Sequence, residues 1–437
     1  MPHLHPEQLF LLQTLILVGI PYFIWENKFV KKYIPLVVVQ IILGLLLGPS
    51  VLEKISPEYF EFLFPKSSIP LLQGLAFMAL TLFGFMTGLH LDFEQLKGKG
   101  NGFAITSLSS VVTPLIICSI FGFSLFYYYP NFVGPKAGLI SYSLSIGIVG
   151  AVTALPVLSA ILKEMKFIER RLGKLCLGMA TVNDGFLWIL IAIDLTIAQA
   201  ASGGYTEVLK IIGYSALYFA VMIKIIAPIF RNLIHKGILQ HDPCHKTMVV
   251  VIVYICISAL TTDFIGIHYL LGAFTAGAMI PKELSHGIMV KLERAVEVVL
   301  LPFFFMLTGL KTNFSVSDNE VWMLFIWAVI FSTIGKVLGV AIPAYFTLYN
   351  HKEKRKAIEK SLVLGSFMQS QGLMEVVVLN ILLQAEILTP ISFAALLLMA
   401  IFKTAMTKPS VLLIHRIFGR KEYTGEVKQI NNEIIEM

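Results

Sequence analysis

Apolar stretches long enough to cross a lipid bilayer follow one another along almost the whole chain. A helix needs about 20 apolar residues, rising about 1.5 Å each, to span the hydrocarbon core. On that measure we expect about thirteen spans, near residues 8–25, 33–52, 70–90, 102–128, 137–163, 172–200, 207–230, 247–264, 267–281, 294–312, 320–348, 357–384 and 389–418. The sequence therefore predicts an all-α polytopic membrane protein, embedded in the lipid bilayer.

Composition and charge support the membrane and exclude other classes of protein. Hydrophobic residues make up 57% of the 437 residues and charged residues only 14%, which is more apolar surface than a soluble domain can bury. The net charge of +7 is carried by short basic runs between apolar stretches and does not form one basic face, so we expect no nucleic-acid partner.

Enzymatic and metal chemistry find no support in the sequence. The four cysteines form no CxxC pair, and no histidine stands at ligand spacing from them, so we expect no disulfide framework, cofactor or metal cluster. No nucleophile–base pair or phosphate loop is present in the sequence, which argues against an enzyme. The N-terminus lacks a basic region and a cleavage site, so the first apolar stretch is expected to be a retained helix.

The basic residues also predict the orientation. Alternate loops, including 163–174 and 352–360, hold most of the 34 lysines and arginines, whereas the opposite loops hold Lys54, Lys66 and Lys136. By the positive-inside rule the N-terminus lies outside and the C-terminus in the cytoplasm, in the cell (inner) membrane. We expect one membrane domain, residues 1–418, followed by a short cytoplasmic tail, 419–437.

A carboxylate near the bilayer midplane is the strongest pointer to function. Asp184, preceded by Asn183, lies about 12 residues, or roughly 18 Å, into its span. A charge there costs roughly 2.5–3.5 kcal/mol and is tolerated mainly beside a polar cavity or a partner, so we expect a functional role. A protonated carboxyl that only holds helices together is the alternative. For Asp194, ten residues later, a carboxylate near the interface is the simpler interpretation.

Two spans are interrupted in corresponding places. In span 137–163, Pro156 clashes with the carbonyl of Val152, so the helix should loosen around 152–156 and offer that carbonyl and the Thr153 hydroxyl as oxygen ligands for an alkali cation. In span 357–384, the polar run that ends with Gln371 and Gly372, followed by Glu375, interrupts an apolar helix. Two interrupted helices in corresponding halves indicate a midplane binding site.

Two lysines lie too deep in their spans to reach an interface easily. Lys336 and Lys403 are expected to face a carboxylate, Asp184 or Glu375. For Lys336, a structural counter-charge and a direct transport role remain equally open.

Several segments of the sequence resemble a known family, the monovalent cation:proton antiporters of the Kef and plant cation/H+ exchanger branch. The segments AVTALPVLSAILKEM and RLGKLCLGMATVNDGFLWIL resemble the broken helix of this family and its adjacent Asn-Asp helix. Five further segments resemble others in the family's order: VVVQIILGLLLGPSVL, IHYLLGAFTAGAMIP, LLPFFFMLTGLKTNF, STIGKVLGV and QGLMEVVVLNI. The similarity covers about residues 10–418.

The resemblance implies an inverted-repeat antiporter fold with two discontinuous crossing helices. It implies a core bundle at about 102–200 and 320–418, which moves against a scaffold and dimerisation part at about 8–90 and 207–312 of a homodimer. Asp184 looks like the carboxylate that alternately holds a proton and a cation, Thr153 like the ligand on the unwound helix, and Lys336 like the core lysine. Because the tail is short, we expect no attached nucleotide-binding regulatory domain.

The resemblance also carries departures. Gln40 and Gln371 stand where relatives often carry charged residues, and Asn183 stands where one branch has a second aspartate. With one carboxylate in that pair, the resemblance favours electroneutral, one-for-one exchange.

The expected function is exchange of Na+ or K+ for H+, with both ions competing for Asp184 and with alternating access by movement of the core bundle. The alternatives are a cation channel or ligand-gated sensor on the same scaffold, and a symporter for an organic anion, which the Asn183-Asp184 pair argues against.

Overall fold

The computed structural model describes residues 5–27, 30, 36–49, 51–90, 100–168, 170–203, 205–235, 244–311, 319–347 and 354–418. Nearly every ordered element in these residues is a helix, and Val133 and Leu388 form an isolated antiparallel bridge. Eight helical segments of the described chain are long and apolar enough to cross a membrane. The prediction of an all-α membrane protein is confirmed, whereas the count of about thirteen spans and the sides of the termini stay predictions.

The first group of helices includes those at the N-terminal end and those in the middle of the chain. We call it the scaffold. Its N-terminal helices are α1 (Pro6–Thr14), α2 (Ile20–Trp25), α4 (Leu36–Leu47), α5 (Leu52–Ile55), α6 (Pro57–Leu63) and α7 (Ile69–His90). Its helices from the middle of the chain are α12 (Tyr205–Val221), α13 (Ala227–His235), α14 (His245–Ile265), α15 (Tyr269–Ala278), α16 (Lys282–Ala295) and α17 (Leu301–Lys311). Short π-helical turns join α1 to α2 (Leu15–Gly19), α12 to α13 (Met222–Ile226) and α16 to α17 (Val296–Leu300). Within it, α15 packs closely on α7 and α17 on α4.

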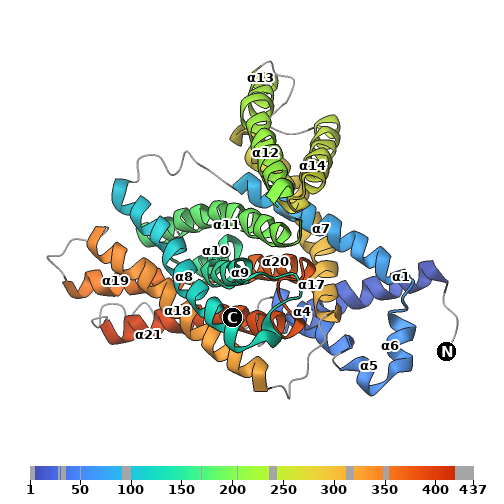
Figure 1. Ribbon diagram of the computed structural model, residues 1–437, viewed down its shortest axis with the longest axis horizontal. Coiled ribbons are helices and arrows are strands. Elements are labelled where there is room, and N and C mark those ends of the chain that lie inside the picture. The colour runs from blue at the N-terminus through green and yellow to red at the C-terminus, as the bar shows by residue number, and fades with distance from the viewer. Residues whose placement is uncertain are drawn as a thin grey trace.

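The second group, the core bundle, combines two segments far apart in the sequence. It consists of α8 (Gly100–Tyr128), α9 (Leu139–Ala151), α10 (Leu155–Glu164), α11 (Arg171–Gly203), α18 (Asn319–Thr347), α19 (Lys354–Phe367), α20 (Leu373–Gln384) and α21 (Pro390–Phe418). In each segment a long helix is followed by a helix broken in two and then by another long helix. Figure 1 shows α8, α18, α19 and α21 on one side of the molecule, α1 and α4–α6 on the other, and α9, α10 and α20 near the centre.

Close backbone contact holds α7 against α15 in the scaffold. Gly88 and Gly277 face each other's helices so closely that an added Cβ on either would overlap backbone atoms, of Phe274 and Phe85 respectively. In a bilayer, where lipid is as apolar as a leucine side chain, such small-residue contacts are a main source of helix association. The pair therefore holds the backbones of α7 and α15 close together.

The buried apolar side chains form two clusters. The larger cluster joins the scaffold to one half of the core bundle and includes Trp188 of α11 and Phe274 of α15. The smaller cluster, which includes Leu158, Met179 and Phe367, is built from core-bundle residues alone within the described chain. Among the described residues, the apolar cluster shared with the scaffold therefore includes one part of the core bundle, and the other part has an apolar cluster of its own.

Candidate functional site

The two broken helices meet at their breaks, near the centre of the core bundle. The first break, Val152–Ala154, separates α9 from α10, and the second, Met368–Gly372, separates α19 from α20. Three hydrogen bonds join the breaks: Ala154 N donates to Ser370 O at 2.9 Å, Thr153 Oγ1 to Met368 O at 2.8 Å, and Gln371 Nε2 to Val149 O at 3.3 Å. The crossing brings backbone carbonyls to the middle of the core bundle, where non-helical backbone is tolerated because it is buried in protein.

The expected loosening around 152–156 agrees with the first break, although the role of the proline differs in detail. Ala154 caps the N-terminus of α10, and Pro156 lies in the first turn of that helix. A proline in a first turn loses no helical hydrogen bond, because the N–H groups there have no partner within the helix. Pro156 therefore fits the start of a new helix and does not kink a continuous one.

The second break depends on Gly372. Its backbone has φ +114° and ψ −128°, a region that residues with a side chain rarely adopt, and an added Cβ would lie 2.9 Å from Cγ2 of Val157. We expect Gly372→Ala to destabilise the protein by about 1–3 kcal/mol, measured as a lower midpoint of thermal unfolding in detergent.

Gly74 supplies the matched control for that prediction. It lies inside α7, and no atom would come within 4 Å of an added Cβ. Gly74→Ala should be neutral or raise the midpoint, since alanine favours a helix over glycine by about 0.5–1 kcal/mol. Equal midpoints for the two variants would show that the backbone at Gly372 is not strained by a side chain.

Asp184 and Asn183 reach this crossing from α11. Both side chains are buried, at 2% and 3% exposure, and Oδ1 of Asp184 has no hydrogen-bond partner among the described residues. The hydrogen-bonding neighbours of Asn183 determine the orientation of its amide group. The amide oxygen lies 3.0 Å from Lys336 Nζ and 3.2 Å from Thr153 Oγ1, and the amide nitrogen lies 2.9 Å from Ser110 Oγ. Asn183 is thus held by α8, α18 and the first break, while Oδ1 of the neighbouring carboxylate has no partner among the described residues.

Lys336 of α18 is fully buried and ties three parts of the core bundle together. Its ammonium donates to the carbonyl of Ser110 on α8 at 3.1 Å and to that of Ala151, the last residue of α9, at 2.5 Å. An ammonium carries three donors, and these two carbonyls together with the amide oxygen of Asn183 account for all of them. Lys336 therefore caps the end of α9 beside the break.

Glu375 of α20 and Lys403 of α21 are buried behind the second break. Neither oxygen of Glu375 has a hydrogen-bond partner in the described part of the chain. Lys403 donates to Oγ of Ser332, which in turn donates to the carbonyl of Gly150 at 3.2 Å. Lys403 thus reaches the same end of α9 as Lys336, through a serine.

These side chains form an alternating series of charges. Electrostatic interactions join Lys336 to Lys403, Glu375 and Asp184, and Glu375 to both lysines. With all four ionised, the buried charges sum to zero, which is the arrangement that burial away from water demands.

The sequence-predicted residues therefore come together at one place. The crossing gathers Val152, Thr153, Asn183, Asp184, Lys336 and Gln371, with Glu375 and Lys403 connected to it through the charge series. Gln371 binds the carbonyl of Val149, not a charged group.

Ser110, whose carbonyl binds Lys336, and Ser332, whose hydroxyl binds Lys403, are not among the residues predicted from the sequence. Both are small polar residues inside long apolar helices, and that is the signal that could have found them.

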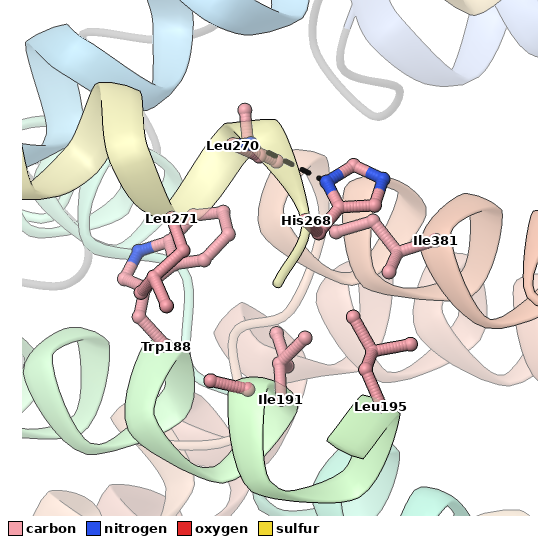
Figure 2. A pocket seen from close by; sticks show the side chains of 8 residues that line it. Trp188, Ile191, Leu195, His268, Leu270, Leu271 and Ile381 are labelled. Atoms are coloured by element: carbon pink, nitrogen blue, oxygen red, sulfur yellow. Dashed lines mark hydrogen bonds between the residues drawn. The ribbon is translucent and has the colours of Figure 1, made fainter. Parts of the chain in front are cut away.

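One side of the site is closed by apolar contacts between the core bundle and the scaffold. Trp188, one turn after Asp184 on α11, packs against Phe274 of α15 with ring centroids 5.2 Å apart. A small cavity lies further along this contact, between α11, α15 and α20, and Figure 2 shows His268, Leu271 and Ile381 around it. Asn380 Nδ2 of α20 also donates to Thr308 Oγ1 of α17 at 3.2 Å. These contacts pack α11 and α20 of the core bundle against α15 and α17 of the scaffold.

Comparisons with known proteins agree with this arrangement. Residues 14–413 match the family described as sodium/hydrogen exchanger, transmembrane. The Na(+)/H(+) antiporter NhaS4 of Synechocystis is 30% identical over 414 residues, covering 93% of this chain and 97% of that protein. Cation/H(+) antiporter 15 of Arabidopsis thaliana is 31% identical over 93% of this chain, and K(+)/H(+) antiporter 1 of Saccharomyces cerevisiae is 27% identical over 94%.

The chain spans about half the length of these plant and yeast relatives, 48% and 47% respectively. Among solved structures, the sodium proton antiporter MjNhaP1 of Methanocaldococcus jannaschii superposes with a TM-score of 0.62, covering 94% of this chain and 98% of that one, at 14% identity. The likeness to that structure concerns the fold. All these relatives are transporters and none is an enzyme.

Proposed function

The chain belongs to the sodium/hydrogen exchanger family, and from this membership we propose that it exchanges a monovalent cation, Na+ or K+, for protons across the cell (inner) membrane. The observation that carries the proposal is the Asp184 carboxylate. It is buried beside two crossing helix breaks, and one of its oxygens has no hydrogen-bond partner among the described residues. Relatives are named for Na+ and for K+, and both cations take oxygen ligands, so the proposal includes both.

The competition between proton and cation takes place at this carboxylate. A buried carboxylate is stable when a proton or a cation neutralises it. The Thr153 hydroxyl, the Asn183 amide oxygen and the carbonyl of Val152 supply further oxygens for a dehydrated alkali cation. Because either ligand brings one positive charge to Asp184, the site binds one or the other and not both.

Electroneutral exchange follows from the charge series. Lys336 is held by two carbonyls and an amide oxygen, which supports a fixed counter-charge that keeps its proton during the cycle. With the other three charges constant, the core bundle carries the same charge whether Asp184 holds H+ or a cation. One cation then moves for each proton.

Alternating access is a movement of the core bundle against the scaffold. The apolar contact at Trp188 and Phe274 closes the end away from the basic loops, which we assign to the outer side. At the other end the apolar cluster of the core bundle contains no scaffold residue among those described, so that end can separate more easily. The scaffold also forms the contact of a homodimer.

The test is dissipation of a pH gradient in proteoliposomes containing the purified protein. Na+, K+ and Li+ are added in turn, and each measurement is repeated with the membrane potential clamped. We expect saturable proton movement driven by Na+ or K+ that clamping leaves unchanged. Cation flux without counter-movement of protons would instead indicate a channel, and a rate that changes with the clamp would contradict electroneutral exchange.

A further inference from the structure

A third buried carboxylate of the core bundle, Asp194, lies outside the charge series. Asp194 follows Asp184 by ten residues on α11, about 15 Å along the helix axis, and is 0% exposed. Asp184, Leu187, Ile191 and Asp194 follow the 3–4–3 spacing of one helix face, and all four are buried. Asp194 is thus an interior group, and its interpretation as a carboxylate near the interface does not explain its complete burial.

A single polar contact to Asp194 exists in the described part of the chain. Ser145 of α9 donates from Oγ to Oδ2 of Asp194 at 2.5 Å, whereas Oδ1 is shielded from solvent and has no partner. A neutral hydroxyl orients the carboxyl but does not balance a charge.

Among the described residues, the helices packed against this face of α11 supply no counter-charge; His268, at the start of α15, lines the same cavity as Ile191 and Leu195 but has no electrostatic interaction with Asp194. The sequences of α8 and α9 contain no aspartate, glutamate, lysine, arginine or histidine, and the nearest titratable group on α9 is Tyr142, one turn before Ser145. On α12, Lys210 and Tyr214 have exposed side chains. The series that contains Lys336 and Lys403 reaches Asp184 but does not include Asp194.

A buried carboxylate without a counter-charge is stable when it holds a small cationic ligand. The cavity of Figure 2 is lined by Ile191, Ala192 and Leu195 but not by Asp194. Among the described residues, Asp194 belongs to no group of three or more histidine, cysteine, aspartate or glutamate side chains that could hold a metal ion. We propose that Asp194, oriented by Ser145, is a second proton-binding site at the outer end of the core bundle, through which outer pH adjusts cation binding at Asp184.

The coupling between the two carboxylates is electrostatic. At an effective dielectric constant of about 20, unit charges about 15 Å apart change each other's ion binding by about sixfold. The ionised form of Asp194 attracts a cation to Asp184, and protonation from the outer side removes that attraction. Acid outside therefore weakens cation binding from the outer side beyond direct competition at Asp184. This inference rests on the proposed function.

The first test measures the outer cation concentration for half-maximal exchange at several values of outer pH. Asp194→Asn keeps the size of the side chain and an oxygen that accepts from Ser145, but it cannot ionise. We expect its half-saturating concentration to be about sixfold higher than that of the wild type at alkaline outer pH and equal at acid outer pH.

Two control variants separate ion binding from a structural contact. Asp263→Asn removes an exposed aspartate of α14 and should retain the wild-type dependence on outer pH, and Asp194→Glu should restore it. An unchanged half-saturating concentration in Asp194→Asn, or the same change in Asp263→Asn, would overturn the proposal.

The second test does not depend on transport. Infrared difference spectra between acid and alkaline pH should contain a carboxylic C=O band that is absent in Asp194→Asn and present in Asp184→Asn. A spectrum of Asp194→Asn identical to that of the wild type would overturn the second site, even if exchange itself were absent.

Discussion

Replacement of Asp184 by asparagine is expected to reduce cation-driven proton movement in proteoliposomes to that of protein-free vesicles. Asparagine has nearly the same shape as aspartate but can neither release a proton nor neutralise a cation. Oδ1 of Asp184 has no hydrogen-bond partner among the described residues, so the substitution breaks no described hydrogen bond at that oxygen. Because asparagine has the charge and nearly the shape of the protonated aspartate that the proposed cycle requires, the midpoint of thermal unfolding should stay close to that of the wild type.

Asp263 provides the matched control. It is an exposed aspartate in the last turn of α14 and lies outside the charge series. Asp263→Asn should retain exchange at the wild-type rate in the same vesicles. Retained exchange in Asp184→Asn would refute the central role of this carboxylate, and a shared loss in both variants would point to a general effect on the protein.

The placement of the breaks could be predicted from the sequence because backbone chemistry is local. Pro156 and the polar residues before Gly372 interrupt otherwise apolar segments, and the structure breaks both helices within four residues of these signals. Asp184 was recognisable for a similar reason, since a carboxylate deep in an apolar span is costly wherever the span packs.

The pairing of the buried groups could not be predicted, because it depends on how each helix is rotated and which neighbour it faces. The sequence left open whether Lys336 or Lys403 faces each carboxylate, and the structure places Lys336 between Asp184 and Glu375. The burial of Asp194 could not be predicted for the same reason. Its distance along α11 suggests the interface, but the contact with α9 buries it completely.

Replacement of Lys336 by methionine is expected to cause the largest loss of stability among single substitutions in the charge series. Methionine keeps much of the volume but removes both hydrogen bonds to backbone carbonyls and leaves the carboxylates with one buried lysine. Removal of one partner from a buried set of charges typically costs about 3–5 kcal/mol. The midpoint of thermal unfolding in detergent should fall accordingly, and exchange should be lost.

The double variant Lys336→Met/Glu375→Gln tests whether charge balance is the cause. The double variant leaves one buried carboxylate of the series, Asp184, and one buried lysine, Lys403. The balance of charge is therefore restored, while the hydrogen bonds of Lys336 stay absent. We expect a midpoint clearly above that of Lys336→Met but below that of the wild type, with a coupling energy of about 0.5–3 kcal/mol between the two positions.

Lys136→Met is the control for the general effect of removing a lysine. Lys136 pairs with Glu386 at 2.9 Å on the surface, where the two side chains are 58% and 48% exposed. An exposed ion pair contributes only about 0.2–1 kcal/mol, so this variant should stay close to the wild type. Additive effects of Lys336→Met and Glu375→Gln would show that Lys336 stabilises the core bundle through its carbonyl contacts alone. Recovery in the double variant would instead establish that the four buried charges act as one balanced set, in which Asp184 exchanges its ion while the other three charges stay constant.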